Sequence, residues 1–243
     1  MIVLTSGCLT AHILPRGATL AGLWHSDVPR SLVLGFADPA SFATCPIYAG
    51  AIVGPIANRI SPTTVDILGQ SFAMHANEGD ACLHSGPGGV HGLDWQVSAQ
   101  SDNSVTLSSV LADGAAGLPG LRHIAVTYRL HEDAVMSVVI HAISDRDTVI
   151  NLAHHPYWCL DDAVDISGHH LMVVADHYLP VDAKMIPTGQ ITSVNGTDFD
   201  FRTARPVPTD RTLDANLCLF SARRTTPARA AILNGNSGVK LLI

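Results

Sequence analysis

The sequence predicts an all-β protein. Glutamate and lysine each occur only twice in 243 residues, although these residues normally cover the exposed faces of helices. Short alternating runs of apolar and polar residues are separated by Gly, Pro, Asn and Asp clusters, at the spacing of about 8–12 residues that is typical of β-sandwiches and barrels. We find no linker, low-complexity segment or internal repeat. These observations favour antiparallel strands in a single domain over residues 1–243.

The clearest expected element is a hairpin. Apolar residues alternate along Ile124–Leu130, residues 131–134 form the turn with Glu132 in it, and Val135–Ile143 returns. The final segment, residues 230–243, is expected to form a strand, a turn and a last apolar strand. Other strands are expected, in chain order, at Ile2–Leu4, Thr64–Leu68, Trp95–Ala99, Val105–Val110, Thr148–Leu152, Val164–Ile166 and Leu171–Val174.

Charge and hydropathy limit the partners. The net charge of −7 repels a phosphate backbone, so nucleic acid is not an expected partner. No apolar run of about 18 residues predicts a membrane span, and the N-terminus lacks the pattern of a signal peptide. The five cysteines contain no CxxC pair, which predicts thiols in a reducing compartment. We therefore expect a cytoplasmic protein without a membrane partner, either a monomer or a homodimer.

Two loop clusters carry polar side chains that could serve a site. Gly54–Ile60 contains Asn58 and Arg59; a guanidinium there could hold a hydroxyl or a carboxylate, or it could cap loop carbonyls in a purely structural role. The second cluster, Asn77–Trp95, contains His84 and His91. Its glycines lack a phosphate-loop pattern, and its histidines lack the H-x-H spacing of a β-barrel metal site. His84 is either a hydrogen-bonding group beside a loop or a core histidine.

Two further clusters are less specific by themselves. Asn151–Leu160 places His154 and His155 beside Tyr157. Because adjacent side chains of a strand point to opposite faces, only one of the two histidines can face a given pocket. A titratable imidazole beside aromatic rings suits a sugar site, but an aromatic core cluster would look the same. Asp214 precedes an apolar run and is, taken alone, a typical turn residue.

Six motifs spread from residue 54 to residue 219 together resemble the aldose 1-epimerase (galactose mutarotase) family. GPIANRI is similar to that family's G-R-x-x-N-R-I, NEGDACLHSG to N-x-x-x-x-LHGG, and NLAHHPYWCL to NLTNHSYFNL. DHYLPVD followed by IPTG is similar to D-x-Y-L-P-V-D…I-P-T-G, GTDFDFR to G-T-P-F-D-F-R, and LDANLCL to D-H-N-F-x-L. The order and spacing of the six are far more specific than any one of them.

The resemblance implies a galactose mutarotase-like super-sandwich of mainly antiparallel strands that binds an aldohexose such as glucose or galactose. It implies interconversion of the α and β anomers by acid and base catalysis, with no metal or organic cofactor. By this resemblance His155 is the general acid at the ring oxygen and His84 a second imidazole assisting there. Arg59 and Asp214 bind sugar hydroxyls, and we expect Asn58 and Tyr157 to contact the substrate beside them.

The sequence departs from the family pattern at the general base. The family's base is a glutamate in a G-x-C-L-E-x-Q type of context after the D-H-N-F motif, and neither Glu78 nor Glu132 matches it. The expectation is a domain that lacks its C-terminal strands, including the one with the base. Pro55, His154 and Ala215 also replace family residues.

The alternatives to an active epimerase are a catalytically inactive sugar-binding homologue and a histidine-rich metal-binding β-protein.

Overall fold

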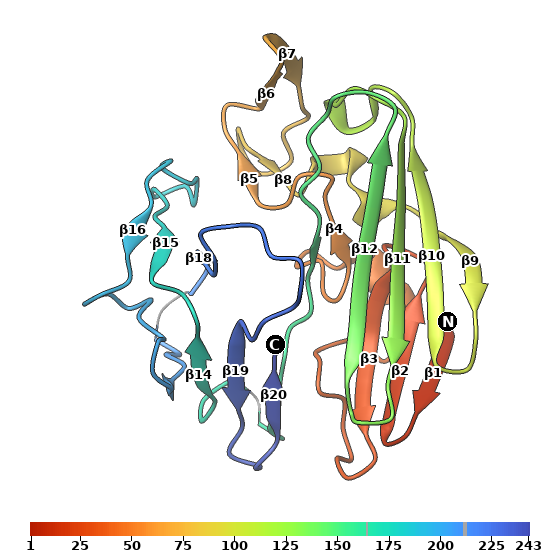
Figure 1. The fold of residues 1–243 in the computed structure, drawn as a ribbon, viewed down its shortest axis with the longest axis vertical. Coiled ribbons are helices and arrows are strands. Elements are labelled where there is room, and N and C mark those ends of the chain that lie inside the picture. The colour runs from red at the N-terminus through yellow and green to blue at the C-terminus, as the bar shows by residue number, and fades with distance from the viewer. Residues whose placement is uncertain (164, 211–212) are drawn as a thin grey trace. The chain divides into compact units, whose positions relative to one another are not determined.

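The computed structural model describes residues 1–163, 165–210 and 213–243, almost entirely as strands and loops (Figure 1). The expectation of an all-β chain with antiparallel sheets is confirmed. The chain divides into two compact units, Met1–Trp158 and Cys159–Ile243; the single domain over residues 1–243 stays a prediction. The helices of the described residues are short 3-10 segments: η1 (Pro39–Thr44), η2 (Gly86–Gly88), η3 (Val90–Gly92) and η4 (Ala115–Gly117).

Unit 1 is built on two antiparallel sheets, which overlap in the view of Figure 1 and share one hydrophobic core. One has the order β1-β2-β3 and the other the order β12-β11-β10-β9. Alternation along β1, β2 and β11 buries every second side chain over most of their length, so that Leu4 and Ile13 share one core with Val126 and Leu130. The strands are β1 (Ile2–Ser6), β2 (Leu9–Leu14), β3 (Thr19–His25), β9 (Gln96–Gln100), β10 (Ser104–Leu111), β11 (Arg122–Leu130) and β12 (Met136–Ser144).

Three pairs of short antiparallel strands complete unit 1. They are β4 (Ile52–Val53) with β13 (Ala153–His154), β5 (Arg59–Ile60) with β8 (Cys82–Leu83), and β6 (Thr64–Ile67) with β7 (Gln70–Ala73). The first two pairs join segments that are far apart in the sequence, with Ile52 opposite His154 and Arg59 opposite Leu83. These two pairs position the candidate site.

Unit 2 contains a four-stranded sheet of order β17-β14-β19-β20 and a three-stranded sheet of order β16-β15-β18. Asp161 fixes the turn between β19 and β20, because its carboxylate accepts hydrogen bonds from the backbone N–H groups of Asn236 (2.9 Å) and Ser237 (2.8 Å). The strands are β14 (His170–Val173), β15 (His177–Leu179), β16 (Thr192–Ser193), β17 (Arg205–Pro206), β18 (Asn216–Cys218), β19 (Ala231–Asn234) and β20 (Lys240–Leu242).

The longer expected strands are confirmed, including the hairpin of β11 and β12 and the strand-turn-strand of β19 and β20. The strand expected over Thr148–Leu152 is wrong: Asn151 forms an isolated parallel bridge with Ile56, and pairing in a strand begins only at Ala153. Of the strand expected over Val164–Ile166, Val164 lies outside the described residues, and the two residues after it form no strand. The cysteines form no disulfide among the described residues. None of the described helices has the length and apolar character needed to cross a membrane.

Candidate active site

Short strand pairing brings three of the four polar clusters together within unit 1. Because β5 pairs with β8, Arg59 lies opposite Leu83, next to His84. Pairing of β4 with β13 continues past the strand ends, where the His155 N–H donates to the Ala51 carbonyl at 2.9 Å. The rings of His84 and His155 meet edge to face, with centroids 5.3 Å apart and planes at 80°.

The protonation state of His84 follows from its hydrogen bonds. The ring Nδ1 of His84 accepts a hydrogen bond from the backbone N–H of Asn58 at 3.0 Å. The backbone N–H of His84 donates to the Asn58 carbonyl at 3.1 Å. An accepting Nδ1 leaves the proton of the neutral ring on Nε2. Burial, and secondarily the neighbouring His155, lowers the pKa of His84 to about 4. Near neutral pH, His84 is therefore a neutral hydrogen-bond donor through Nε2.

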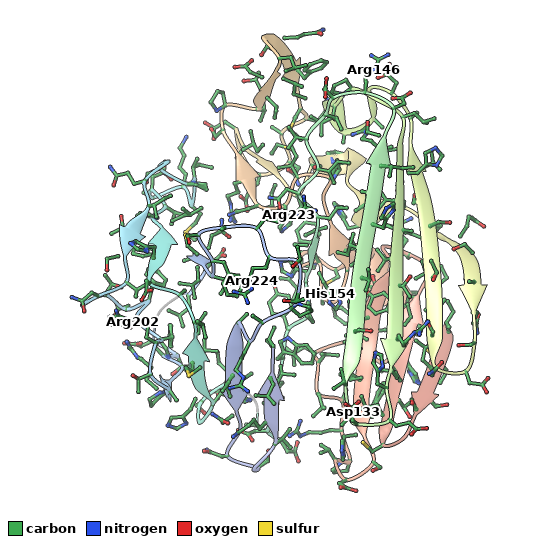
Figure 2. All side chains as sticks on the ribbon, viewed as in Figure 1. Asp133, Arg146, His154, Arg202, Arg223 and Arg224 are labelled. Carbon is green, nitrogen blue, oxygen red and sulfur yellow. The ribbon has the colours of Figure 1, made fainter. Side chains whose placement is uncertain are left out.

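The two adjacent histidines face opposite sides, as expected from their position at a strand. The ring of His155 packs against Tyr157, with centroids 5.2 Å apart, and against His84. His154 packs instead against the buried ring of Tyr128, with centroids 5.6 Å apart; Figure 2 labels it on β13. Burial lowers the pKa of His154 to about 4. His155 is thus the histidine of this pair that belongs to the candidate site, and His154 is a core residue.

Arg59 is held by a carboxylate that the sequence motifs do not indicate. Its Nε and one terminal nitrogen donate to the two carboxylate oxygens of Glu78, the second at 3.0 Å. This two-pronged hydrogen bond lowers the pKa of Glu78, so the carboxylate stays ionised. The side-chain oxygen of Asn58 accepts the Arg59 N–H at 2.7 Å. Asn58 therefore orders Arg59 and His84, while its contact with a substrate stays a prediction.

Left-handed backbone conformations concentrate at this site. Tyr48, Asn58, His84 and Ser85 have φ of 55°, 66°, 53° and 66°, a region that non-glycine residues rarely adopt. Such residues cost of the order of 1–3 kcal/mol each and occur preferentially at functional sites. Ser85 links the segment of His84 to the loop that precedes Arg59, because its Oγ accepts a hydrogen bond from the Ile56 N–H at 2.8 Å. Sequence reasoning missed Tyr48, because a left-handed residue other than glycine or asparagine has no composition signal. It missed Glu78, because the ion pair with Arg59 joins residues 19 positions apart.

Asp214, from the fourth of the polar clusters, belongs to unit 2. It lies two residues before β18, whose Leu217 is opposite Tyr178 of β15. Its expected role as a hydroxyl binder stays a prediction.

The grouped side chains of unit 1 include two imidazoles and a guanidinium, with the aromatic ring of Tyr157 beside His155. Such a set can protonate or polarise a hydroxyl or ether oxygen. Within the described ranges, no three or more His, Cys, Asp or Glu side chains are arranged to hold a metal ion.

The two histidines of lowered pKa predict a loss of stability in acid. His84 and His154 titrate near 4 in the folded protein and near 6.5 when unfolded, so the unfolded state binds more protons between these values. The free energy of unfolding should therefore fall from pH 6.5 to pH 4, by about 1–3 kcal/mol per histidine. Urea unfolding across this range measures it.

Replacement of one of the two histidines measures its contribution to the pH dependence of the free energy of unfolding. His154→Asn should flatten the pH dependence, whereas His141→Gln, at an exposed position of β12, should leave it unchanged. If His154→Asn keeps the full slope, the burial of a neutral His154 does not cause the effect.

Known proteins similar to this chain are sugar epimerases. The sequence model of the family "Aldose 1-epimerase" matches residues 1–242. The aldose 1-epimerase of Escherichia coli K12 is 35% identical over 182 residues, which cover 74% of this chain and 53% of that protein. Human galactose mutarotase is 34% identical over 236 residues, which cover 90% of this chain and 67% of that protein. The chain thus spans about half the length of the bacterial relative and two thirds of the human one.

Solved structures agree with the sequence comparisons. A GalM/aldose epimerase homologue from C. elegans superposes with a TM-score of 0.90 at 32% identity, covering 98% of this chain and 75% of that one. The galactose 1-epimerase of Lactobacillus acidophilus NCFM gives a TM-score of 0.82 at 25% identity, covering 96% of this chain and 71% of that one. The fold expected from the motifs, galactose mutarotase-like and mainly antiparallel, is confirmed.

Proposed function

This chain belongs to the aldose 1-epimerase family, and from that premise we propose that the protein interconverts the α and β anomers of an aldohexose such as glucose or galactose. The observation that carries the proposal is the edge-to-face pair of His84 and His155, with ring centroids 5.3 Å apart. Two imidazoles at this separation can both reach the neighbourhood of one sugar ring oxygen.

In the proposed reaction His155 is the general acid. A base removes the proton of the C1 hydroxyl, the C1–O1 bond becomes a carbonyl, the bond from C1 to the ring oxygen breaks, and that oxygen takes a proton from His155. Rotation about C1–C2 exposes the other face of the aldehyde. The ring oxygen then attacks C1, returns its proton to His155, and O1 regains a proton from the base, so both groups end each turnover as they began.

His84 assists the same oxygen without changing its own charge. Its Nδ1 is occupied by the Asn58 N–H, so Nε2–H is the donor that it can offer to the substrate. A donor aimed at the place where negative charge develops stabilises the transition state more than the ground state. We assign sugar hydroxyls to Arg59 and Asp214, as the family resemblance implies, and substrate contacts beside them to Asn58 and Tyr157.

The base in this proposal is neither of the two glutamates of the chain. The Glu78 carboxylate is engaged by Arg59. Glu132 lies in the turn between β11 and β12, and its neighbour Asp133 lies far from His154 in Figure 2. We assign the base to the glutamate of the family's G-x-C-L-E-x-Q context, a context that neither Glu78 nor Glu132 matches.

Polarimetry of freshly dissolved α-glucose and α-galactose tests the proposal on the full-length protein. We expect the optical rotation to reach equilibrium faster with protein than in buffer alone, in proportion to protein concentration. No acceleration with either sugar would contradict the proposal.

A second function is favoured by the engagement of Glu78 and the position of Glu132: a sugar-binding relative without catalysis. This alternative predicts a calorimetric binding signal with a hexose and no effect on the rate of mutarotation. Calorimetry on the same preparation therefore separates an inactive binder from a protein that does not bind hexoses at all.

A further inference from the structure

We propose that Tyr48 is a positioning residue of the site, whose ring fixes the orientation of the His84 and His155 imidazoles relative to each other; its catalytic consequence rests on the proposed function above. The sequence motifs that indicate the site do not include this tyrosine. It lies in the loop between η1 and β4, outside every motif that indicates the site.

The ring of Tyr48 contacts three histidines. Its centroid lies 4.8 Å from His84 with planes at 84°, 4.8 Å from His91 at 79°, and 6.3 Å from His155 at 58°. Edge-to-face pairs of this kind each contribute about 0.5–1.5 kcal/mol beyond the area they bury. Tyr48 therefore contacts both proposed catalytic rings and constrains both at once.

The backbone couples Tyr48 directly to His155. In the turn after Tyr48, the Ala51 N–H donates to the Tyr48 carbonyl at 3.1 Å. The Gly50 N–H donates to the His155 carbonyl at 2.8 Å. Gly50 is at φ 69°, and a Cβ there would lie 2.0 Å from the Leu20 carbonyl oxygen. The Leu20 N–H donates to the Gly50 carbonyl at 2.9 Å, which fixes the turn to β3. Tyr48 itself adopts φ 55°, a strained conformation for a bulky residue. A rigid turn thus carries the ring and holds the His155 backbone.

The ring, and not the hydroxyl, carries this role. The Tyr48 hydroxyl meets the Asn77 amide nitrogen at 3.4 Å, which is long for a hydrogen bond and correspondingly weak. The Asn77 side chain is anchored instead to Leu83, whose N–H it accepts at 2.7 Å and whose carbonyl it binds at 3.1 Å. Loss of the hydroxyl should therefore leave the arrangement of the rings intact.

Space beside Tyr48 shows why its ring is needed. A cavity of about 160 Å³ is lined by Tyr48 together with Arg16, Phe42, Cys45 and His91. Removal of the ring would enlarge this cavity up to His84 and His155, and both imidazoles would gain freedom to rotate. Phe42 lines the same cavity, but its ring packs against Phe36, with centroids 5.0 Å apart. Phe42 thus provides a matched control.

Kinetics of four variants of the full-length protein test the inference. Tyr48→Phe should keep kcat within about twofold of wild type, whereas Tyr48→Leu and Tyr48→Met should lose about 10–100-fold in kcat with KM changed less than about threefold, since poor orientation affects the chemical step. Phe42→Leu should behave as wild type. If the wild type is active, full activity in Tyr48→Leu or Tyr48→Met would overturn the inference. Equal losses in Tyr48→Phe and Tyr48→Leu would also overturn it.

Imidazole ¹⁵N–¹H NMR tests the positioning without turnover, and so separates this inference from the proposed function. Tyr48→Phe should leave the ring signals of His84 and His155 as in wild type. Tyr48→Met, which fills the space without a planar ring, should shift or broaden both. Unchanged signals in Tyr48→Met would overturn the inference even if the wild type accelerates mutarotation, and a wild type without mutarotase activity would overturn the proposed function alone.

Discussion

His155→Ala is expected to lower kcat for mutarotation by about 10²–10⁴-fold, the usual contribution of one positioned proton-transfer group. The ring oxygen would then have to leave C1 without its acid. KM should change only a few-fold, because the hydroxyl binders remain. Stopped-flow or manual polarimetry with α-galactose gives both constants.

The neighbouring histidine provides the control. His154 packs against Tyr128 in the core, and His154→Asn, which introduces the residue of the family motif, should keep kcat within a few-fold of wild type. Thermal unfolding of both variants shows whether a loss of activity is a loss of fold. Equal activity of His155→Ala and wild type would remove His155 from the mechanism, and equal losses in the two variants would assign the effect to structure.

Replacement of Arg59 is expected to have the second largest effect. Arg59→Met removes the charged donors and leaves the Glu78 carboxylate without its two-pronged partner. Hydrogen bonds to charged groups contribute about 1.5–3 kcal/mol, which corresponds to a fall in kcat/KM of about 10–100-fold. Most of this fall should appear in KM if Arg59 binds a hydroxyl equally in the ground and transition states.

Glu78→Gln separates binding by Arg59 from its positioning. The amide retains one acceptor and loses the charge, so Arg59 keeps its own charge but is held less firmly. We expect an intermediate loss of about 3–10-fold in kcat/KM. If the double variant Arg59→Met with Glu78→Gln loses no more than Arg59→Met alone, Glu78 acts through Arg59. A loss in Glu78→Gln equal to or larger than that in Arg59→Met would show that Glu78 has a direct role.

The parts of the fold that the sequence predicted are those in which alternation persists over many residues. β11 and β12 extend over nine residues each with side chains in alternate environments, and a period of two is visible there without any structure. Pairs such as β5 with β8 have two residues per strand, too few for any period. These short pairs nevertheless place Arg59 beside His84.

Thr148–Leu152 illustrates why propensity alone was misleading. The segment is rich in β-branched and apolar residues, but its backbone forms hydrogen bonds with a neighbouring loop. The Asn151 N–H donates to the Pro55 carbonyl at 2.6 Å, and the Ala57 N–H donates to the Asn151 carbonyl at 2.8 Å. Tertiary hydrogen bonds to the Gly54–Ile60 loop therefore replaced the expected strand. The same bonds bring the loop that precedes Arg59 close to the segment that leads to His155.

The candidate site was predictable where a motif named a side chain and not where geometry selected one. The motifs indicated His84, His155 and Arg59, and the structure brings these three together. The ring of Tyr48 packs against residues 36 or more positions away in the sequence. Glu78 forms an ion pair with a residue 19 positions away. Such contacts depend on turns with left-handed residues, for which a single sequence carries no signal.

Exchange between the two anomers at equilibrium measures whether the protein opens the sugar ring and whether His155 is needed for it. Saturation-transfer NMR of the anomeric protons of galactose measures ring opening and closure without any net change in composition. We expect exchange well above the rate in buffer with the full-length wild-type protein, and exchange close to the buffer rate with His155→Ala. Exchange at the buffer rate with the wild type, or equal exchange in the two proteins, would contradict this expectation.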